Sequence, residues 1–540
     1  MGRLARWGRT AGRGAALVAV VAVVVAPLAL AWGVTTTRVH DTIGVSPATF
    51  SLSTDGRSAL ELGLAGTVYV PRAKGPFGLV ARVDAPTDAD ALPDGTSDLA
   101  SLVSPQMLEV YAGLYHHPGR AIDGYVDLLR ARLVHDVLLA EVLLTVVGSG
   151  AVLVLRRVLP LGEVGRGRTA GVVLLALVLT TASAVAVGRV DRTPASGASY
   201  PLPVLDDTAA AGATTDSPVL RLLLGDAVTK IRVLTQRQTD ASDDYRTRAS
   251  AQLDAQAEAM AVPEKGETAV LMQSDMHCNE VMIALQTQVR RMLEKQAGSE
   301  VPAVLAIAGD LTTNGTAAER DCVRAERAVA GTKPVVAVTG NHESDQSVQQ
   351  MKSAGMDVLD GSTRTVGGLS FLGAPDPERT ELFGASHLCG TATETSMGTA
   401  LRRRAEDDKP TIVLVHEAYA AKAFLGTEEN MRTFDGSDVF DVPASAVFYG
   451  HWHRSVPPRV VQNSDGTWTL VMELDTSGGA IATPTFNHFS TPWTPPAQEA
   501  SFPVVFVDDE TRLVTGYQLY SFATDGTVTV QPRVDVGPTS

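Results

Sequence analysis

Long apolar stretches alternate with polar segments in the N-terminal part of the chain. The apolar stretches cover residues 15–32, 137–155 and 169–188. Each is close to the ~20 apolar residues that span a bilayer core, so the pattern predicts three transmembrane helices. Arginines precede the first stretch and fill the hairpin between the second and the third. Because positive charge stays on the cytoplasmic side, we expect residues 1–14 and 156–168 to be cytoplasmic and all residues after 188 to lie outside.

The first apolar stretch also allows a second interpretation. Ala29-Leu30-Ala31 resembles the small-residue site at which a signal peptide is cleaved. The apolar run is long for a signal peptide, which favours an uncleaved anchor. Either interpretation leaves the topology of the rest of the chain unchanged.

Two polar segments flank the second and third apolar stretches. Residues 33–136 alternate like strands in their first half and like helices in their second half, which predicts an extracytoplasmic segment of mixed α/β structure. Residues 189–265 begin with a stretch rich in Pro, Ala, Thr and Asp and continue with a helical pattern. They are typical of an extracytoplasmic linker followed by a helical spacer or packing element.

From residue 266 onward, short apolar runs alternate with helical stretches. The runs cover residues 269–272, 303–308, 335–338, 369–372, 412–415 and 446–449. Buried strands that alternate with helices indicate an α/β fold. We therefore predict one α/β domain over residues 266–540.

Five polar blocks lie just beyond the carboxyl ends of these predicted strands. The blocks are Asp275-Met276-His277, Gly309-Asp310, Gly340-Asn341-His342-Glu343, His416 and Gly450-His451-Trp452-His453. In open α/β sheets, ligands gather in the crevice outside the carboxyl ends of the strands. We therefore expect the five blocks to meet at one rim of the domain.

The side chains in these blocks are metal ligands of one chemical type. Carboxylate, imidazole and a single amide oxygen form a donor set suited to Mn, Fe or Zn. A centre with two metals needs one carboxylate that bridges them, and Asp310 is the natural candidate. Two metals roughly 3.5–4 Å apart can hold a hydroxide and clamp a phosphoryl group for in-line displacement.

As a set, the blocks resemble the calcineurin-like metallophosphoesterases, whose motifs D-x-H, G-D, G-N-H-[DE], H and G-H-x-H occur here in that order. The resemblance implies a four-layer αββα sandwich with two mixed β-sheets. It also implies two divalent metal ions. One would be held by Asp275, His277, Asp310 and His453, and the other by Asp310, Asn341, His416 and His451. His342 would assist the leaving group as a proton donor, supported by a neighbouring carboxylate, for which Glu343 is one candidate.

Composition narrows the class of partner. The chain has 45 basic and 60 acidic residues, which gives a formal charge of −15. Because nucleic-acid affinity rests on neutralisation of phosphates by basic residues, we do not expect general nucleic-acid binding. Arg outnumbers Lys, and Ala and Val are abundant, which is typical of a bacterial protein from a high-GC genome. Nothing in the sequence fixes the oligomeric state.

Three cysteines are too few for a disulfide framework. Cys278 follows the first polar block and Cys322 lies after the Gly-Asp loop, so both are expected near the same rim. An oxidising exterior would permit a disulfide between them, and two free buried thiols are the alternative. Cys389 would be left over.

Together these observations predict a multi-pass membrane protein with an extracytoplasmic hydrolase domain that cleaves phosphate mono- or diesters. The location favours an envelope or extracellular substrate, such as a nucleotide or a lipid head group. An alternative function is a membrane sensor, in which residues 33–136 recognise a ligand and the phosphoesterase domain is regulatory or inactive.

Overall fold

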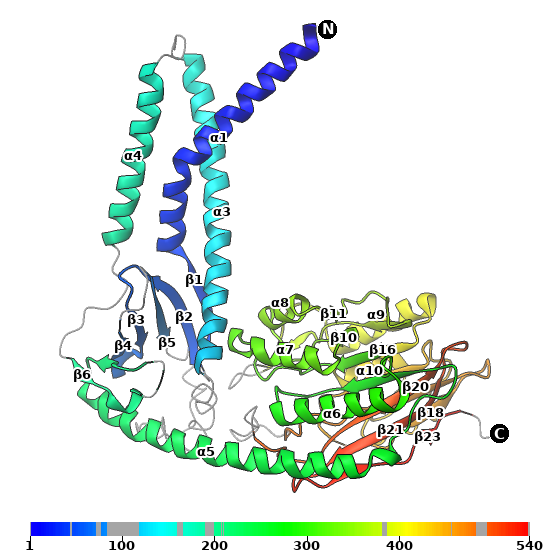
Figure 1. Cartoon of the computed structure of the whole chain (residues 1–540). Coiled ribbons are helices and arrows are strands. Elements are labelled where there is room, and N and C mark those ends of the chain that lie inside the picture. The colour runs from blue at the N-terminus through cyan, green and yellow to red at the C-terminus, as the bar shows by residue number, and fades with distance from the viewer. Residues whose placement is uncertain are drawn as a thin grey trace. The chain divides into compact units, whose positions relative to one another are not determined.

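The computed structural model describes residues 2–43, 46–71, 77–83, 118–158, 166–189, 199–206, 208, 210–380, 386–454, 456–481 and 494–537. The chain divides into two compact units (Figure 1). The N-terminal unit comprises residues 1–89 and 122–229, and the C-terminal unit comprises residues 90–121 and 230–540. Parts of the predicted outer segment (84–117), cytoplasmic hairpin (159–165) and linker (190–198) lie outside the described residues.

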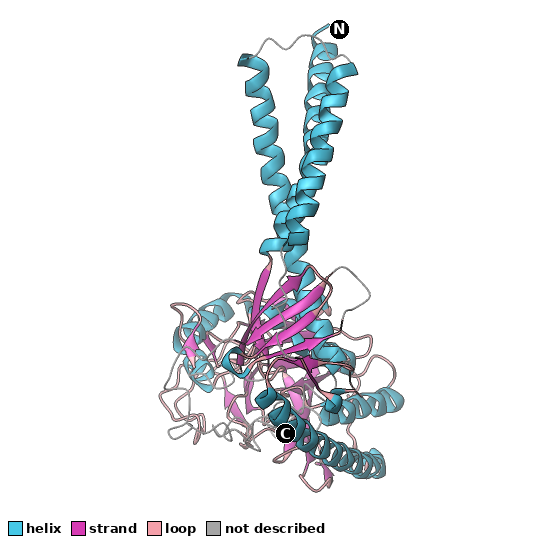
Figure 2. Cartoon of the chain, turned by 90° about the vertical axis from the view of Figure 1, so that its left-hand side faces the viewer, coloured by secondary structure: helices cyan, strands magenta, loops and turns pink. Residues whose placement is uncertain are grey.

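The N-terminal unit contains three long helices that extend away from its sheet (Figures 1 and 2). They are α1 (Gly2–Thr36), α3 (Pro118–Val158) and α4 (Arg166–Arg189). Many of their large apolar side chains are exposed, including Val23, Val146 and Leu174. Exposed apolar surface of this extent marks a surface that contacts a membrane or another protein.

Two of these helices are long and apolar enough to cross a membrane, over Gly14–Thr36 and Ile122–Val154. They are consistent with membrane association, and the second begins well before the predicted residue 137. The third predicted span stays a prediction: among the fully described residues of α4, the apolar stretch runs from Leu174 to Val185.

The sheet of the N-terminal unit has the strand order β1-β2-β5-β3-β4-β7-β6. Its strands are β1 (Arg38–Ile43), β2 (Ser46–Ser53), β3 (Ser58–Glu61), β4 (Thr67–Val70), β5 (Gly78–Val83), β6 (Tyr200–Pro201) and β7 (Thr214–Thr215). Neighbouring strands are antiparallel except β3 and β5, which are parallel. The sheet thus combines strands that lie between α1 and α3 in the sequence with two strands that follow α4.

The C-terminal unit is built on two mixed sheets. The first has the order β11-β10-β9-β8-β20-β21-β22, with β23 also paired to β21. Its strands are β8 (Glu267–Gln273), β9 (Val304–Ala308), β10 (Val335–Val338), β11 (Asp357–Val358), β20 (Ala500–Asp508), β21 (Val514–Phe522), β22 (Val528–Val530) and β23 (Val534–Asp535). Strands β8 to β11 are parallel, and β20 to β23 are antiparallel to their neighbours.

The second sheet has the order β12-β13-β16-β17-β19-β18. Its strands are β12 (Arg364–Val366), β13 (Leu369–Gly373), β16 (Ile412–Leu414), β17 (Ala446–Tyr449), β18 (Arg459–Gln462) and β19 (Trp468–Glu473). The four inner strands are parallel and the two edge strands are antiparallel. A short hairpin, β14 (Glu378–Arg379) and β15 (His387–Leu388), stands apart from both sheets.

Three layers of buried side chains hold this unit together. One layer joins the facing sides of the two sheets, with Met272, Val338, Phe371 and Phe448 among its members. A second lies between the first sheet and α5 (Pro218–Ala255), α6 (Glu280–Ala297), α7 (Arg320–Val329) and α8 (Asp345–Ser353). The third lies between the second sheet and α9 (Glu394–Asp408) and α10 (Ala418–Leu425). The predicted α/β class with mixed sheets is thus confirmed.

Alternation of side chains explains these layers. Along β8, Val270 and Met272 face the layer between the sheets, whereas Ala269 and Leu271 face the helices. Successive strand side chains point to opposite faces, so a strand that is apolar at every position is buried on both sides. The C-terminal half of α5 belongs to the same core, because Tyr245 is fully buried against it.

Glu326 on α7 is an exception within this core and gives a pH-dependent prediction. Burial raises its pKa to about 8, and the nearby amide of Gln273 opposes the rise only in part. Between pH 4.5 and 8 the folded protein keeps a proton that the unfolded chain has lost, so this group's stabilising contribution falls as the pH rises through that window. We expect Glu326→Gln to flatten the fall and to stabilise the C-terminal unit at pH 8 by on the order of 3 kcal/mol.

Denaturant unfolding at pH 5 and pH 8 measures this effect. Glu510→Gln, which changes an exposed glutamate of the same unit, is the matched control and should leave the pH dependence unchanged. Equal pH slopes for the parent protein and Glu326→Gln would contradict the prediction.

Candidate metal centre

The five polar blocks lie on loops that follow five parallel strands. The loops after β8, β9 and β10 carry Asp275 and His277, Asp310, and Asn341, and these strands are neighbours in the first sheet. The loops after β16 and β17 carry the three remaining histidines of the predicted set, and those strands are neighbours in the second sheet. Parallel neighbouring strands end at the same edge of their sheet, so the predicted ligands from each sheet lie together at one edge.

The structure brings all seven predicted ligands together. The ligand atoms of Asp275, His277, Asp310 and His453 lie within 4.8 Å of one another, and so do those of Asp310, His416 and His451. The amide oxygen Oδ1 of Asn341 joins the second group, because it lies 3.1 Å from both His416 Nε2 and His451 Nδ1. Asp310 is the one residue common to both groups.

Hydrogen bonds to backbone carbonyls orient two of the imidazoles. Nδ1 of His416 donates to the carbonyl of Ala308 at 2.9 Å, and Nδ1 of His453 donates to the carbonyl of Ala480 at 2.7 Å. A proton on Nδ1 leaves a lone pair on Nε2 in the neutral ring. Both Nε2 lone pairs therefore point into the centre.

In the neutral rings, acceptor atoms therefore face other acceptor atoms, an arrangement that suits a cation. His416 Nε2 lies 3.2 Å from Asp310 Oδ2, and His453 Nε2 lies 3.0 Å from Asp275 Oδ1. Asp275 Oδ1 is buried and accepts no hydrogen bond from the described residues. Carboxylate and imidazole donors of this kind fit Mn, Fe or Zn.

The electrostatic surroundings keep the two aspartates ionised. Burial by itself would raise the pKa of Asp310, but the imidazoles of His416 and His342 hold that pKa well below its usual range. Burial is likewise outweighed at Asp275, where His453 and His416 lower the pKa of the carboxyl group. Both side chains are therefore available as anionic ligands.

The loops at the centre are tightly constrained. Five of the ligands have a positive φ, namely Asp275, His277, Asp310, His451 and His453. Such conformations cost energy in residues other than glycine and persist where the surrounding structure enforces them. Gly309 has φ +100°, and a Cβ atom there would collide with the His416 ring. A Cβ atom at Gly340 would collide with Asp310, so both glycines are required by the close approach of the loops.

The backbone holds His342 beside Asp310. The ring Nδ1 donates to the carbonyl of Thr313 at 2.8 Å, and the backbone N–H donates to Asp310 Oδ1 at 3.0 Å. Nε2 therefore faces the centre, 4.0 Å from Asp310 Oδ2. Burial lowers the pKa of His342, whereas Asp310 and the Thr313 carbonyl act in the opposite direction.

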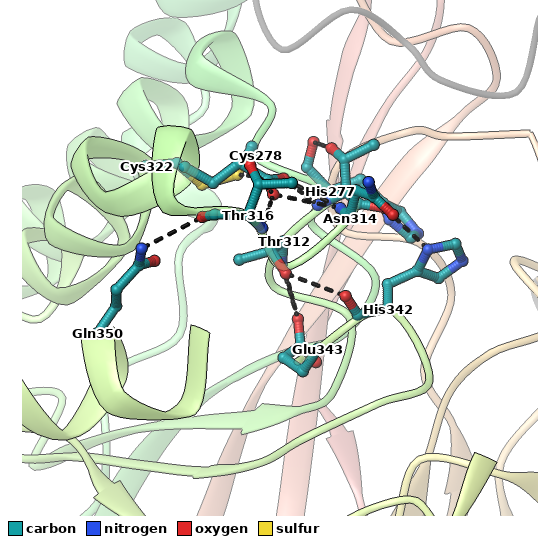
Figure 3. The surroundings of a disulfide bond; sticks show 11 residues. His277, Cys278, Thr312, Asn314, Thr316, Cys322, His342, Glu343 and Gln350 are labelled. Atoms are coloured by element: carbon teal, nitrogen blue, oxygen red, sulfur yellow. Dashed lines mark hydrogen bonds between the residues drawn. A yellow bond between two sulfur atoms is a disulfide. The ribbon is translucent and has the colours of Figure 1, made fainter. Parts of the chain in front are cut away.

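Glu343 has a different role from the one considered for it in the sequence. Its carboxylate accepts hydrogen bonds from the backbone N–H groups of Asp310, Thr312 and Gly340 at 3.0, 2.8 and 2.7 Å, and from the Thr312 hydroxyl at 2.9 Å. Glu343 thus ties the loop after β9 to the loop after β10 (Figure 3). The Nδ1 partner of His342 is a carbonyl, not this carboxylate.

A disulfide joins Cys278 to Cys322 next to the centre (Figure 3). Cys278 directly follows the ligand His277, and Cys322 lies in the first turn of α7. The bond therefore fastens the first ligand loop to a helix of the core. Cys389 is free and exposed.

Two residues that sequence reasoning missed complete the centre. Glu417 Oε1 lies 2.9 Å from His451 Nε2, so this carboxylate orients the ring with Nδ1 toward the other ligands. The hydroxyl of Thr380 accepts a hydrogen bond of 2.6 Å from Asn341 Nδ2, which turns the amide oxygen toward the imidazoles. The adjacency of Glu417 to His416 was a usable signal in the sequence, whereas nothing near Thr380 marked it.

The pair of Glu417 and His451 gives a prediction about metal affinity. A carboxylate that accepts the outer N–H of a metal-binding histidine fixes its tautomer, and its loss costs about 10–100-fold in metal affinity. We expect Glu417→Gln to weaken cation binding by that factor while the fold stays intact. Competition with a chelator measures the affinity, and Glu428→Gln, at an exposed glutamate nearby in sequence, is the control. Equal affinity in the two variants would contradict this role.

One of three comparisons with known proteins agrees with this geometry. Residues 268–455 match the family model of the calcineurin-like phosphoesterases. No curated protein matches the chain. Among solved structures, the chain is similar to one titled "GAP50 the anchor in the inner membrane complex of Plasmodium", with 10% sequence identity and a TM-score of 0.30, over 51% of this chain and 90% of that chain. A TM-score of this size does not define a shared fold.

The family match begins in β8 and ends just after His453, so it includes all five ligand loops. It therefore covers the part of the C-terminal unit in which the two groups of ligands share Asp310. Residues 268–455 of this chain form a calcineurin-like phosphoesterase domain.

Proposed function

We propose that this protein is a metal-dependent phosphoesterase that hydrolyses phosphate mono- or diesters at the centre described above. The observation that carries the proposal is the pair of ligand groups joined by Asp310. Nε2 of His416 lies 3.1 Å from Asn341 Oδ1 and 3.2 Å from Asp310 Oδ2, so with the ring neutral three lone pairs face one another. Such an arrangement is stable when cations lie between these atoms.

The seven ligands would hold two divalent cations. Asp275, His277 and His453 would bind one, Asn341, His416 and His451 the other, and Asp310 both. When bound, such cations polarise the phosphoryl oxygens and lower the pKa of water so that a nucleophile forms at neutral pH. The protein fixes the ligand positions through Glu343, Glu417 and Thr380.

His342 is placed to serve the leaving group. Its Nδ1 is held by the Thr313 carbonyl, which leaves Nε2 as the atom that faces the centre. A phosphate ester beside Nε2 adds negative charge, which favours the protonated ring. Nε2–H can then donate its proton to the leaving oxygen, which is general acid catalysis.

The side of the membrane on which the centre lies depends on α4. With residues 1–14 in the cytoplasm, two crossings would return the C-terminal unit to the cytoplasm, and three place it outside. The disulfide between Cys278 and Cys322 supports three crossings, because disulfides persist in oxidising compartments. We therefore infer that α4 crosses the membrane and that the substrate is extracytoplasmic.

A native cysteine tests this topology. Cys389 is exposed on the C-terminal unit, so a maleimide that cannot cross membranes should label it in intact cells. Cys389→Ser is the control for specificity. Labelling that occurs only after the cells are broken would place the centre in the cytoplasm and overturn the inference.

The activity itself is tested on the full chain in detergent. The protein is stripped with a chelator, reloaded with Mn, Fe or Zn, and assayed with p-nitrophenyl phosphate, bis(p-nitrophenyl) phosphate and pyrophosphate. We expect hydrolysis of at least one ester that is lost with the chelator and restored by metal. No turnover with any of the three metals would sink the proposal.

A further inference from the structure

Next to the metal centre lies a group of aromatic and cationic side chains. Trp452 stands between the ligands His451 and His453, and the ring of Tyr419 meets it edge-on at a centroid distance of 6.3 Å. Tyr419 is the second residue of α10 and is 57% exposed. A large ring that is open to solvent at the rim of a catalytic centre is a candidate contact for a substrate.

Two arginines stack on Trp452. The guanidinium carbon of Arg454 lies 4.3 Å from the ring centroid, and that of Arg432 lies 5.2 Å away. Arg454 is held in place by Glu473, to which its Nε and Nη2 donate at 2.8 and 3.0 Å. Arg432 is exposed and forms no salt bridge with any described residue, so its charge, and the face of its guanidinium turned away from Trp452, can serve a ligand.

Glu417 connects this group to the centre. One of its oxygens binds His451 Nε2 at 2.9 Å, and the other accepts a hydrogen bond of 3.5 Å from the backbone N–H of Tyr419. Tyr419 is therefore two positions along the chain from Glu417, whose side chain contacts the predicted ligand His451. A substrate whose phosphate lies at the centre would have its adjoining group within reach of Tyr419 and Arg432.

We propose that Tyr419, Trp452 and Arg432 form a subsite for a planar heterocycle attached to the scissile phosphate, so that the substrate is a nucleoside phosphate ester. The proposal rests on the proposed phosphoesterase function. Tyrosine rings and arginine guanidinium planes both stack on nucleobases, and each such contact contributes about 1–3 kcal/mol. The aliphatic portion of a lipid head group has no flat face to use these contacts.

A matched pair of esters tests the subsite on the full-length, metal-loaded protein. The p-nitrophenyl ester of thymidine 5′-monophosphate and methyl p-nitrophenyl phosphate release the same leaving group and differ in the nucleoside. We expect kcat/KM for the nucleoside ester to exceed that for the methyl ester by at least about 10-fold, the factor that 1.4 kcal/mol of stacking supplies. Tyr419→Leu should reduce this ratio at least about fivefold, whereas Tyr419→Phe, which keeps the ring, should retain it. Arg432→Gln should lower the ratio in the same direction.

The outcomes separate the subsite from the proposed function. If both esters are cleaved with equal kcat/KM, or if Tyr419→Leu leaves the ratio unchanged, the subsite is wrong while the phosphoesterase function stands. If neither diester is cleaved, the assay with p-nitrophenyl phosphate and pyrophosphate decides whether the phosphoesterase function stands. In that case calorimetry of thymidine 5′-monophosphate binding decides the subsite: binding weakened by Tyr419→Leu supports it, and affinity equal to that for methyl phosphate overturns it.

Discussion

Replacement of Asp310 by Asn should abolish metal-dependent hydrolysis. Asp310 is 1% exposed, and it is the only member common to the two groups of ligand atoms found among the described residues. The amide has nearly the same shape but lacks the negative charge that two neighbouring cations would share. Because the loss of an outer hydrogen-bond partner already costs about 10–100-fold, we expect the loss of this ligand to reduce kcat/KM by more than about 100-fold.

Hydrolysis of bis(p-nitrophenyl) phosphate and the number of bound metal ions are the two measurements. Asp345→Asn, which makes the same change at an exposed aspartate at the start of α8, is the control and should behave like the parent protein. If Asp310→Asn kept both its activity and its full metal content, the centre would not be the one described here.

Removal of the disulfide should be the largest single loss of stability. Cys278 and Cys322 are 44 residues apart in sequence, and a crosslink that closes such a loop stabilises a protein by about 4 kcal/mol through restriction of the unfolded chain. We expect the double variant Cys278→Ser/Cys322→Ser to lose about this much in denaturant unfolding. Metal affinity should fall as well, because the bond fastens the loop that carries Asp275 and His277.

Reduction of the parent protein should reproduce the effect of the double variant, and Cys389→Ser should not. The parent protein and the double variant should have the same stability in excess reductant. If the double variant matched the oxidised parent protein in stability, the crosslink would have no structural role.

The sequence was sufficient to predict the position of the ligands because their placement follows from a property of backbones. Side chains after parallel strands meet at a common edge, so Asp275, Asp310 and Asn341 could be assigned to one rim without coordinates. The positive φ values at Asp275 and Asp310 could not be foreseen, since they arise from the close approach of loops from two sheets.

Interactions between distant segments set the limit of sequence reasoning. Thr380 orients Asn341 from a loop 39 residues away, and no periodicity marks such a contact. Tyr419 and Trp452 are likewise ordinary apolar residues until the fold brings their rings together. The third membrane span stays a prediction, because among the fully described residues of α4 the apolar stretch runs only from Leu174 to Val185.

The shared carboxylate also has a consequence for how the centre fills. An anion that serves two binding positions cannot neutralise both cations fully, so the first ion to bind weakens the attraction for the second. Occupancy of the two positions is then thermodynamically linked, and a calorimetric titration should resolve a tight step followed by a weaker one. In a medium poor in transition metals, the weaker position would exchange its ion with the surroundings, so the supply of that ion would set the fraction of molecules ready to turn over.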